Sequence, residues 1–140
     1  MTRDDLLAFV RKHRLAVVAT VSAEGMPAAA VVGIAASDAF ELIFDTAATS
    51  NKARNLRANG KVAMVVGWDH ERTLQIEGLA DAPQGAELAR IRRVYFDAWP
   101  DGRERLAWPD LIHLRVRPAL LRYSDFGSER PTLVTLHGPF

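Results

Sequence analysis

The chain has 140 residues, 49% of them hydrophobic and 25% charged, and its formal net charge is +1. This length predicts a single domain over residues 1–140, large enough to bury a core without staples. The absence of cysteine excludes disulfides, thiolate catalysis and cysteine metal sites. The nearly balanced charge gives no reason to expect nucleic acid or an anionic membrane as a partner.

The N-terminal segment gives a first indication of compartment. It begins with charged residues and continues into an amphipathic stretch, which is unlike a secretory signal peptide. The longest apolar run, residues 28–36, is too short to span a bilayer. We therefore expect a cytoplasmic protein with no membrane partner, and the lack of cysteine is consistent with that compartment.

The first half of the chain predicts a helix followed by antiparallel strands. Thr2 is a suitable N-cap for a helix whose apolar face holds Leu6, Leu7 and Val10. Three apolar segments follow, and the short links between them leave no room for crossover helices. These segments are residues 15–21, 28–36 and 40–46, and a short helix over residues 50–58 comes next.

The second half predicts more strands and one longer helix. The short polar link at residues 69–72 joins the strand segments 62–68 and 73–82, which favours a hairpin. The helix that follows, at residues 84–98, has one apolar side. A last strand or pair of strands is interrupted at Pro118, and the tail beyond it could extend a sheet edge. The strand segments are 62–68, 73–82, 111–116, 119–123 and 131–136, and the helix is 84–98.

Together these segments predict a mainly β fold. Five or six mostly antiparallel strands with two or three helices favour a closed or half-closed β-barrel with flanking helices. Closure removes the exposed edges that long apolar strands would otherwise present.

The most informative stretch joins the strand at residues 41–46 to the helix that follows it. A helix N-terminus offers unpaired backbone N–H groups and a partial positive charge. Lys52 adds a formal charge in the first turn, and Ser50 is a suitable N-cap whose hydroxyl could also bond an anion. This pattern predicts a small anion site, of the kind that holds a ligand's phosphate. The alternative is a capped surface helix with a solvated basic face.

Motifs for catalysis by the protein's own groups are missing. The sequence contains no nucleophile elbow, P-loop or Gly-x-Gly-x-x-Gly motif, and its four histidines lack the spacing of metal ligands. We therefore predict no metal site, assign no catalytic residue and do not expect protein-borne hydrolysis. An enzyme of this kind would depend on a cofactor, with the protein supplying orientation and electrostatics.

Several blocks resemble, in order, those of the pyridoxamine 5'-phosphate oxidase-like superfamily, the FMN-binding split barrels. Residues 15–27, which end in Glu-Gly-Met-Pro, are similar to that family's opening hairpin. Residues 44–59 resemble its phosphate-binding block, residues 62–78 its next hairpin and residues 114–118 its closing strand. The resemblance covers roughly residues 3–126 and implies an antiparallel, Greek-key-like split β-barrel.

The resemblance also implies a homodimer with two FMN sites at the subunit interface, and an oxidoreductase acting on a small molecule. Matching positions in the family's motifs assign the cofactor contacts. Ser50, Asn51 and Lys52 would face the flavin phosphate, Asp45 and Thr46 would lie along the ribityl chain or ring, and Val31, Val32 and Gly33 would offer backbone to the ring. Thr73 falls near the ring, and Arg115 falls where the oxidases proper carry an arginine for the substrate phosphate.

Two departures from the family pattern change the expected activity. The oxidases proper carry an arginine and a lysine on the second strand, where this chain has the uncharged residues 28–33. The tryptophan before their closing arginine is replaced by Leu111. We therefore expect a divergent member and not a vitamin B6 oxidase.

Two alternatives to a flavin-dependent enzyme stay open. The first is a non-catalytic stress or sensor protein of the same fold that binds a flavin, a deazaflavin coenzyme or haem. The second is a ligand-free interaction module, in which the basic helix would be the contact face. Its cations are Lys52, Arg54, Arg57 and Lys61.

Overall fold

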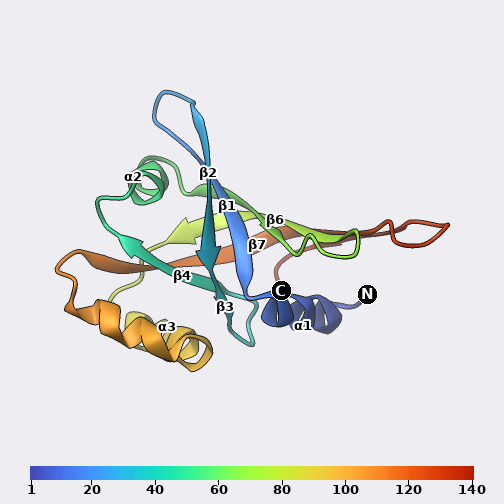
Figure 1. The fold of residues 1–140 in the computed structure, drawn as a ribbon. Helices are drawn as coiled ribbons and strands as arrows, with labels where there is room; N and C mark the ends of the chain where they lie inside the picture. Colours follow the sequence, from blue (N-terminus) through green and yellow to red (C-terminus); the bar gives the residue numbers. More distant parts are fainter.

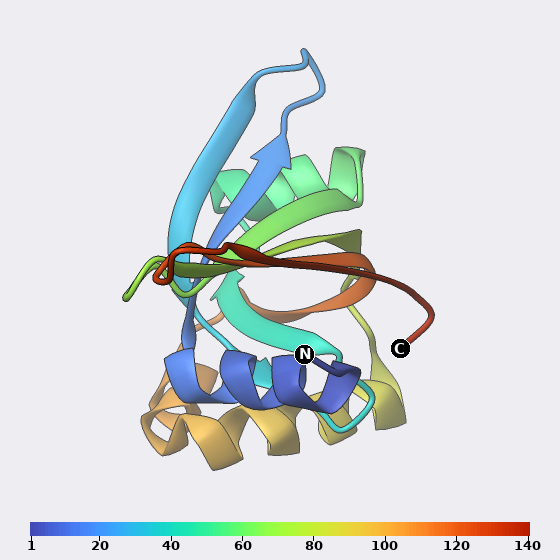
Figure 2. The same cartoon turned by 90° about the vertical axis from the view of Figure 1, so that its right-hand side faces the viewer.

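The computed structural model describes all of residues 1–140 as an antiparallel sheet that curls into a half-barrel, with helices on its flanks (Figure 1). The helices α1 and α3 lie at the bottom of the views in Figures 1 and 2, and α2 lies in the upper half. The elements are α1 (Arg3–His13), β1 (Leu15–Val21), β2 (Pro27–Gly33), β3 (Ala35–Ala36), β4 (Leu42–Ala47), α2 (Asn51–Ala58), β5 (Lys61–Val66), β6 (Arg72–Asp81), α3 (Gly85–Ala98), the 3-10 helix η1 (Pro100–Ala107), β7 (Leu111–Asp125) and β8 (Thr132–His137).

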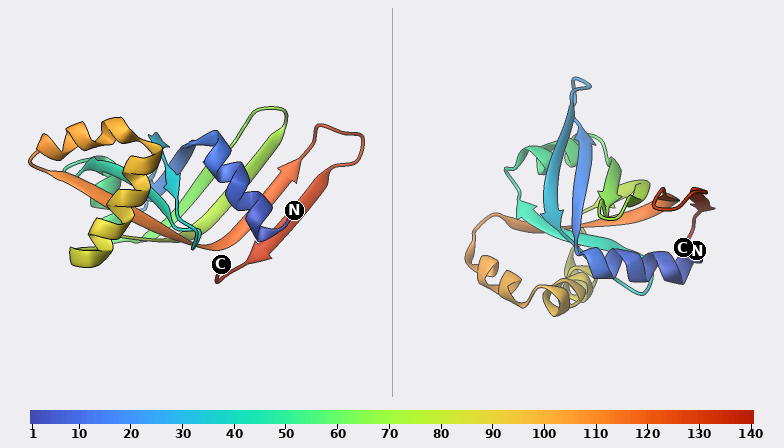
Figure 3. Two further views of the ribbon diagram at one scale, coloured as in Figure 1. Left: turned by 90° about the horizontal axis from the view of Figure 1, so that it is seen from below. Right: turned by 45° about the vertical axis from the view of Figure 1, so that its right-hand side comes forward.

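The strand order is β2-β1-β5-β6-β7-β4-β3, and β8 pairs with the second half of β7. Every pairing is antiparallel. The hairpin of β7 and β8 extends away from α3, which lies on the opposite side of the molecule (Figure 3). The expected mainly β, antiparallel split barrel is thus confirmed.

One apolar segment that was expected to form a single strand forms two. In β2, Gly33 pairs with Leu15, whereas Ala35 in β3 pairs with Ile43. Ile34 lies between the two strands, and its backbone N–H donates to the carbonyl of Arg14. Its carbonyl accepts a hydrogen bond from the indole of Trp99 at 3.0 Å. The first bond extends the pairing with β1 by one residue, whereas the second turns the carbonyl to Trp99, and beyond this point the segment joins β4.

β7 does not break at Pro118, so the predicted interruption is wrong. Pro118 lies opposite Gly78, where the register of β6 shifts between Glu77 and Gly78. A bulge of this kind tolerates the missing N–H of proline. A Cβ atom on Gly78 would lie only 2.4 Å from the carbonyl oxygen of Arg117, so the close approach of the two strands requires glycine here.

Two hydrophobic clusters lie on opposite faces of β4. The larger cluster of 22 buried residues fills the half-barrel and includes Phe40 and Phe44. The smaller one lies beneath α3 and consists of Ala35, Ile43, Ile91, Tyr95 and Phe96. Side chains alternate along a strand, so Phe44 faces one cluster and its neighbour Ile43 the other.

The helix ends agree with the predicted caps. The Thr2 hydroxyl accepts a hydrogen bond from the Asp5 backbone, and the Asp5 carboxylate accepts one from the Thr2 backbone, which is a complete capping box. The break predicted after Ala98 is present, although the chain continues there as η1. Among the helices, none combines the length and apolar character that a membrane crossing would need.

Candidate anion and cofactor site

The turn from β4 into α2 has the geometry that the sequence predicts. Ser50 is the N-cap of α2, and its Oγ accepts a hydrogen bond from the Ala53 backbone at 3.2 Å. The Thr46 hydroxyl donates to the same Oγ at 2.9 Å. The last strand residues and the first helical turn are therefore tied together by side chains, which fixes the direction of the helix N-terminus.

A cavity of about 180 Å³ opens between α2 and the strands β1 and β2. Its walls carry small or apolar side chains from the strands and two polar ones from the helix. The lining residues are Val18, Thr20, Ala28, Ala29, Ala30, Asn51 and Lys52. Since one water occupies about 30 Å³ in the liquid, this space suits a phosphate group and is too small for a whole flavin.

The charge in this cavity is uncompensated. Lys52 forms no ion pair, and residues 51–61 contain four cations and no acid. The backbone N–H groups of the first turn of α2 add a partial positive charge. A cavity with these donors fits a ligand's phosphate.

Two of the larger hollows have their cations already engaged. One of about 450 Å³ lies between α1 and α3, where Arg11 bonds to Asp38 and the Ala36 carbonyl, and the Arg14 guanidinium lies over the Trp99 ring. The other borders the ion network described below. A third hollow, of about 560 Å³ beside α1, contains arginines that pair with Asp4 and Asp38, and a fourth, of about 650 Å³, contains Lys61 together with the acid Glu77. The small cavity at Lys52 has no acid in its lining and is therefore the best of these places for an anion.

Asp45 and Thr46 face opposite ways, as neighbours on a strand must. Thr46 points toward α2 and Ser50, whereas the Asp45 carboxylate accepts a hydrogen bond from Arg105 Nε at 2.7 Å. Arg105 also bonds the Tyr95 hydroxyl, and burial followed by the nearby Asp45 charge raises the pKa of Tyr95 to about 12. Asp45 thus fastens η1 to the sheet, and only Thr46 lies on the side of the cavity.

The residues of β2 that line the cavity are 28–30, and residues 31–33, which were expected beside the flavin ring, lie farther along the same strand. Val31 points outward and is 63% exposed, and Val32 points into the barrel core. Gly33 lies against the Trp99 ring, where a Cβ atom would come within 2.9 Å of that side chain. Their backbone continues from the cavity along the same strand.

Within one chain, Thr73 is distant from Lys52. It lies on β6, and β1 and β5 separate that strand from β2. It also lies beyond the Val66–Leu74 pair, at the end of β5 opposite to the end that follows α2. A six-residue strand is about 20 Å long, so the two residues cannot contact the same small group within one chain.

The family model described as Pyridoxamine 5'-phosphate oxidase matches residues 2–123. The chain belongs to this family. The pyridoxine/pyridoxamine 5'-phosphate oxidase of Bordetella avium is 37% identical over 92 residues, which cover 65% of this chain and 42% of that protein. This oxidase-family chain therefore spans less than half the length of that curated relative.

Solved structures share the fold at low sequence identity. A haem-binding protein from Mycobacterium smegmatis has a TM-score of 0.80 and 19% identity, covering 96% of this chain and 58% of that one. A pyridoxamine 5'-phosphate oxidase-related, FMN-binding protein from Nostoc punctiforme has a TM-score of 0.75 and 14% identity, covering 96% and 89%. The family fold is therefore found in proteins described as binding different cofactors.

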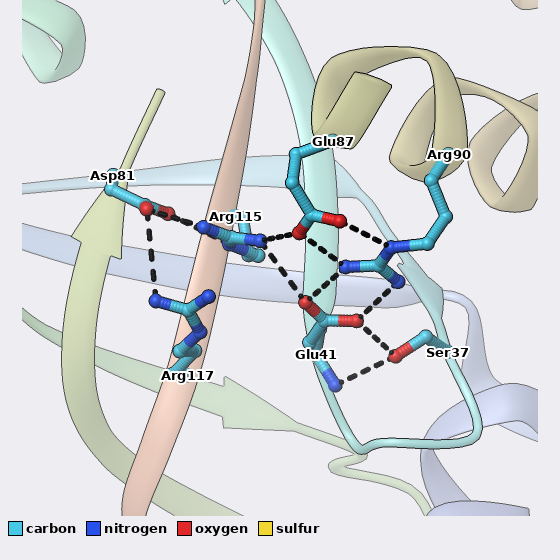
Figure 4. A network of polar contacts seen from close by, with 7 residues as sticks. All are labelled: Ser37, Glu41, Asp81, Glu87, Arg90, Arg115 and Arg117. Carbon is cyan, nitrogen blue, oxygen red and sulfur yellow. Dashed lines mark hydrogen bonds and ion pairs between the residues drawn. The ribbon is translucent and has the colours of Figure 1, made fainter. Parts of the chain in front are cut away.

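Arg115, the expected substrate-phosphate contact of this oxidase-family chain, lies inside an ion network (Figure 4). Its guanidinium donates to Asp81 at 2.6 and 2.9 Å and to Glu87 at 2.7 Å, and a longer bond of 3.3 Å reaches Glu41. The Arg115 side chain is only 5% exposed. The structure therefore does not bring Arg115 together with Lys52, and its donors are engaged with three carboxylates.

The same network holds α3 against the sheet. Arg90 of α3 donates two hydrogen bonds of 2.8 Å to Glu41, and the Ser37 hydroxyl donates a third. The Arg90 hydrogen bonds, followed by those of Ser37 and the charges of Arg90 and Arg115, outweigh burial and hold the pKa of Glu41 at about 2. The Glu41 carboxylate is thus ionised at neutral pH and joins α3 to β4 and β7.

Three buried polar residues, only two of them close to the cavity, were not singled out from the sequence. His113 lies beneath α3, and burial followed by the nearby Arg92 charge lowers its pKa to about 4, so it is neutral at pH 7. Thr20 and Asn55 form a buried hydrogen bond behind the cavity. Of the three, only Thr20 could have been noticed in the sequence, because it is a polar residue at an inward position of β1, after Ala16 and Val18.

Proposed function

We propose that this protein binds FMN as a homodimer and acts as a flavin-dependent oxidoreductase on a small molecule. The observation that carries the proposal is the cavity where the unpaired Lys52 and the N-terminus of α2 meet the small residues of β2. Membership of the oxidase family supports it. The two departures on the second strand and at Leu111 argue against a true pyridoxamine-phosphate oxidase.

In this proposal the chain's own residues bind and orient the cofactor. Lys52 and Asn51 hold the phosphate with the N–H groups of α2, and Thr46 steadies the cap through Ser50. Bound FMN would supply the hydride chemistry, which amino-acid side chains do not carry by themselves. The backbone of residues 31–33 would continue along the cofactor, and Thr73 would reach a flavin only from the second copy.

Replacing Lys52 with alanine should weaken FMN binding about tenfold to a hundredfold. The lost interaction is a charge-assisted contact, worth about 1.5–3 kcal/mol. Titration of flavin fluorescence measures the change. Arg57→Ala is the matched control, because Arg57 is an exposed cation in the last turn of the same helix and does not line the cavity. Equal affinities for both variants would remove Lys52 from the site.

The homodimer is supported by an uncharged sheet face that nothing in the chain covers. Val17 and Ala19 of β1 lie beside Val31 and Ala29 of β2, and all four side chains point away from the barrel core. On the other side, Val17 and Ala19 pair with Val65 and Ala63 of β5. A face of small, flat, apolar residues suits an identical face across a two-fold axis.

Val31→Asp should therefore convert a dimer into a monomer, because each two-fold contact would bury two unpaired carboxylates. Sedimentation velocity at micromolar concentration measures the change. Leu133→Asp is the control, since Leu133 is 68% exposed on β8, similar to the 63% of Val31, but lies on another part of the sheet. A wild-type monomer, or loss of the dimer in both variants, would contradict this interface.

One observation favours a second candidate, a non-catalytic binder of a flavin, deazaflavin coenzyme or haem. Residues 28–33 of β2 carry no cation, so the cavity has less positive charge than the family pattern provides. The absorption spectrum of the purified protein separates the cofactors. A flavoprotein that turns over no electron donor and acceptor pair would favour this candidate over the enzyme.

A further inference from the structure

Two buried polar side chains, Thr20 and Asn55, lie at the back of the Lys52 cavity, each only 5% exposed. Asn55 Nδ2 donates to Thr20 Oγ1 at 3.0 Å, and this is the only side-chain hydrogen bond that either residue makes. A hydroxyl has one proton to donate besides the lone pairs that accept. The Thr20 oxygen is thus engaged as an acceptor, while its proton has no acceptor in the protein.

The free proton belongs to a side chain that lines the cavity. Thr20 lies on the inner face of β1, directly opposite Ala28 of β2, and both residues line the same space as Lys52. The methyl groups of Ala28 and Ala30 are too short to fill the space over Thr20. Figure 1 shows α2 beside this part of the β1–β2 hairpin. Thr20 Oγ1 already has one partner in Asn55, and a ligand oxygen in the cavity would provide an acceptor for its proton.

We propose that Thr20 donates a hydrogen bond to a phosphate-type oxyanion held by Lys52, and that Asn55 is a positioning residue that sets the direction of this hydroxyl. The proposal rests on the proposed function of the same cavity. It names the class of ligand group, the tetrahedral oxyanion of a phosphate monoester such as the end of FMN. Lysine is a flexible point charge, whereas a fixed hydroxyl selects the position of one oxygen.

The alanines of β2 and the Thr20 hydroxyl also explain how the site can bind a phosphate group without cations on β2. Alanines at positions 28 and 30 open a path from the ligand to the neighbouring strand β1. The Thr20 hydroxyl, a neutral donor on β1, then forms one of the ligand's hydrogen bonds. Lys52 and the N-terminus of α2 remain the sources of positive charge.

Thr20→Val tests the hydroxyl directly, because valine keeps the shape and favours a strand. FMN affinity should fall about tenfold or more, the usual effect of losing a hydrogen bond to a charged group. Riboflavin, which lacks the phosphate, should bind the variant and the wild type equally. Thr20→Ser restores the hydroxyl and should restore FMN affinity to within a few-fold. Circular dichroism verifies that each variant is folded.

Inorganic phosphate gives a readout that needs no flavin. At constant ionic strength, phosphate should raise the melting temperature of the wild type and of Thr20→Ser more than that of Thr20→Val. If FMN does not bind but this phosphate effect is present, the flavin function fails and the role of Thr20 stands. If Thr20→Val retains full FMN and phosphate affinity while Lys52→Ala loses it, the role of Thr20 is overturned and the anion site stands.

Asn55→Ala tests the positioning role. It should weaken FMN binding less than Thr20→Val does, because the hydroxyl remains but its orientation is free. The double variant should bind like Thr20→Val alone, since Asn55 acts only through Thr20. Additive losses in this double-mutant cycle would show that Asn55 acts on its own and would overturn its assignment.

Discussion

Replacing Arg115 with methionine is expected to lower the free energy of unfolding by about 3 kcal/mol. The Arg115 side chain is 5% exposed and joins Asp81 of β6 and Glu87 of α3 to Glu41, which lies just before β4 and whose own side chain is 7% exposed. Methionine keeps much of the length but removes the charge, so a buried carboxylate loses one of its partners. Urea denaturation measures the loss, and α3 should loosen first.

The matched control for this experiment is Arg122→Met. Arg122 pairs with Glu77 at 3.7 Å, and both side chains are about half exposed. Exposed ion pairs contribute about 0–1 kcal/mol, so this variant should be close to the wild type. Similar losses for the two variants would contradict the role of Arg115 as a brace. Unchanged FMN affinity in folded Arg115→Met would agree with its distance from Lys52.

Phe44→Ala is expected to cost about 4 kcal/mol of stability. Phe44 is fully buried and lies in the main cluster of the half-barrel. Its removal leaves a cavity that the surrounding strands cannot fill, because hydrogen bonds on both sides fix the position of β4. A thermal or urea melt measures this change.

Phe126→Ala provides the comparison for Phe44, since Phe126 is 54% exposed at the end of β7. The same truncation there should change the free energy of unfolding by less than about 0.5 kcal/mol. A large loss at Phe126 would mean that its exposed ring is covered in solution.

Local patterns in the sequence were sufficient for most of the fold. Strand β1, the cap at Ser50 and the antiparallel arrangement follow from alternation, turn residues and short links. The two failures depend on partners distant in sequence. The carbonyl of Ile34 turns from the sheet to the indole of Trp99, and Pro118 stays in β7 because a bulge at Ala119 lies next to it, opposite Gly78.

The site was harder to predict than the fold for the same reason. The helix start at residues 50–52 is a local pattern and is present as expected. Whether a side chain on β4 faces α2 or η1 depends on strand pairing, which separates Asp45 from Thr46. Arg115 matches a family motif, but only the fold reveals the three carboxylates that surround it, from β6, from α3 and from the residue before β4.

The position of β4 between two hydrophobic clusters has a consequence for motions of the native state. Both faces of this strand are packed, so its amides should exchange with solvent mainly through global unfolding, whereas the edge strand β8 can fray locally. The chain that leaves β4 leads directly to Ser50 and the first turn of α2. The anion-binding end of this helix is therefore tethered to one of the slowest-exchanging parts of the molecule, and arriving ligands would meet donors that are already ordered.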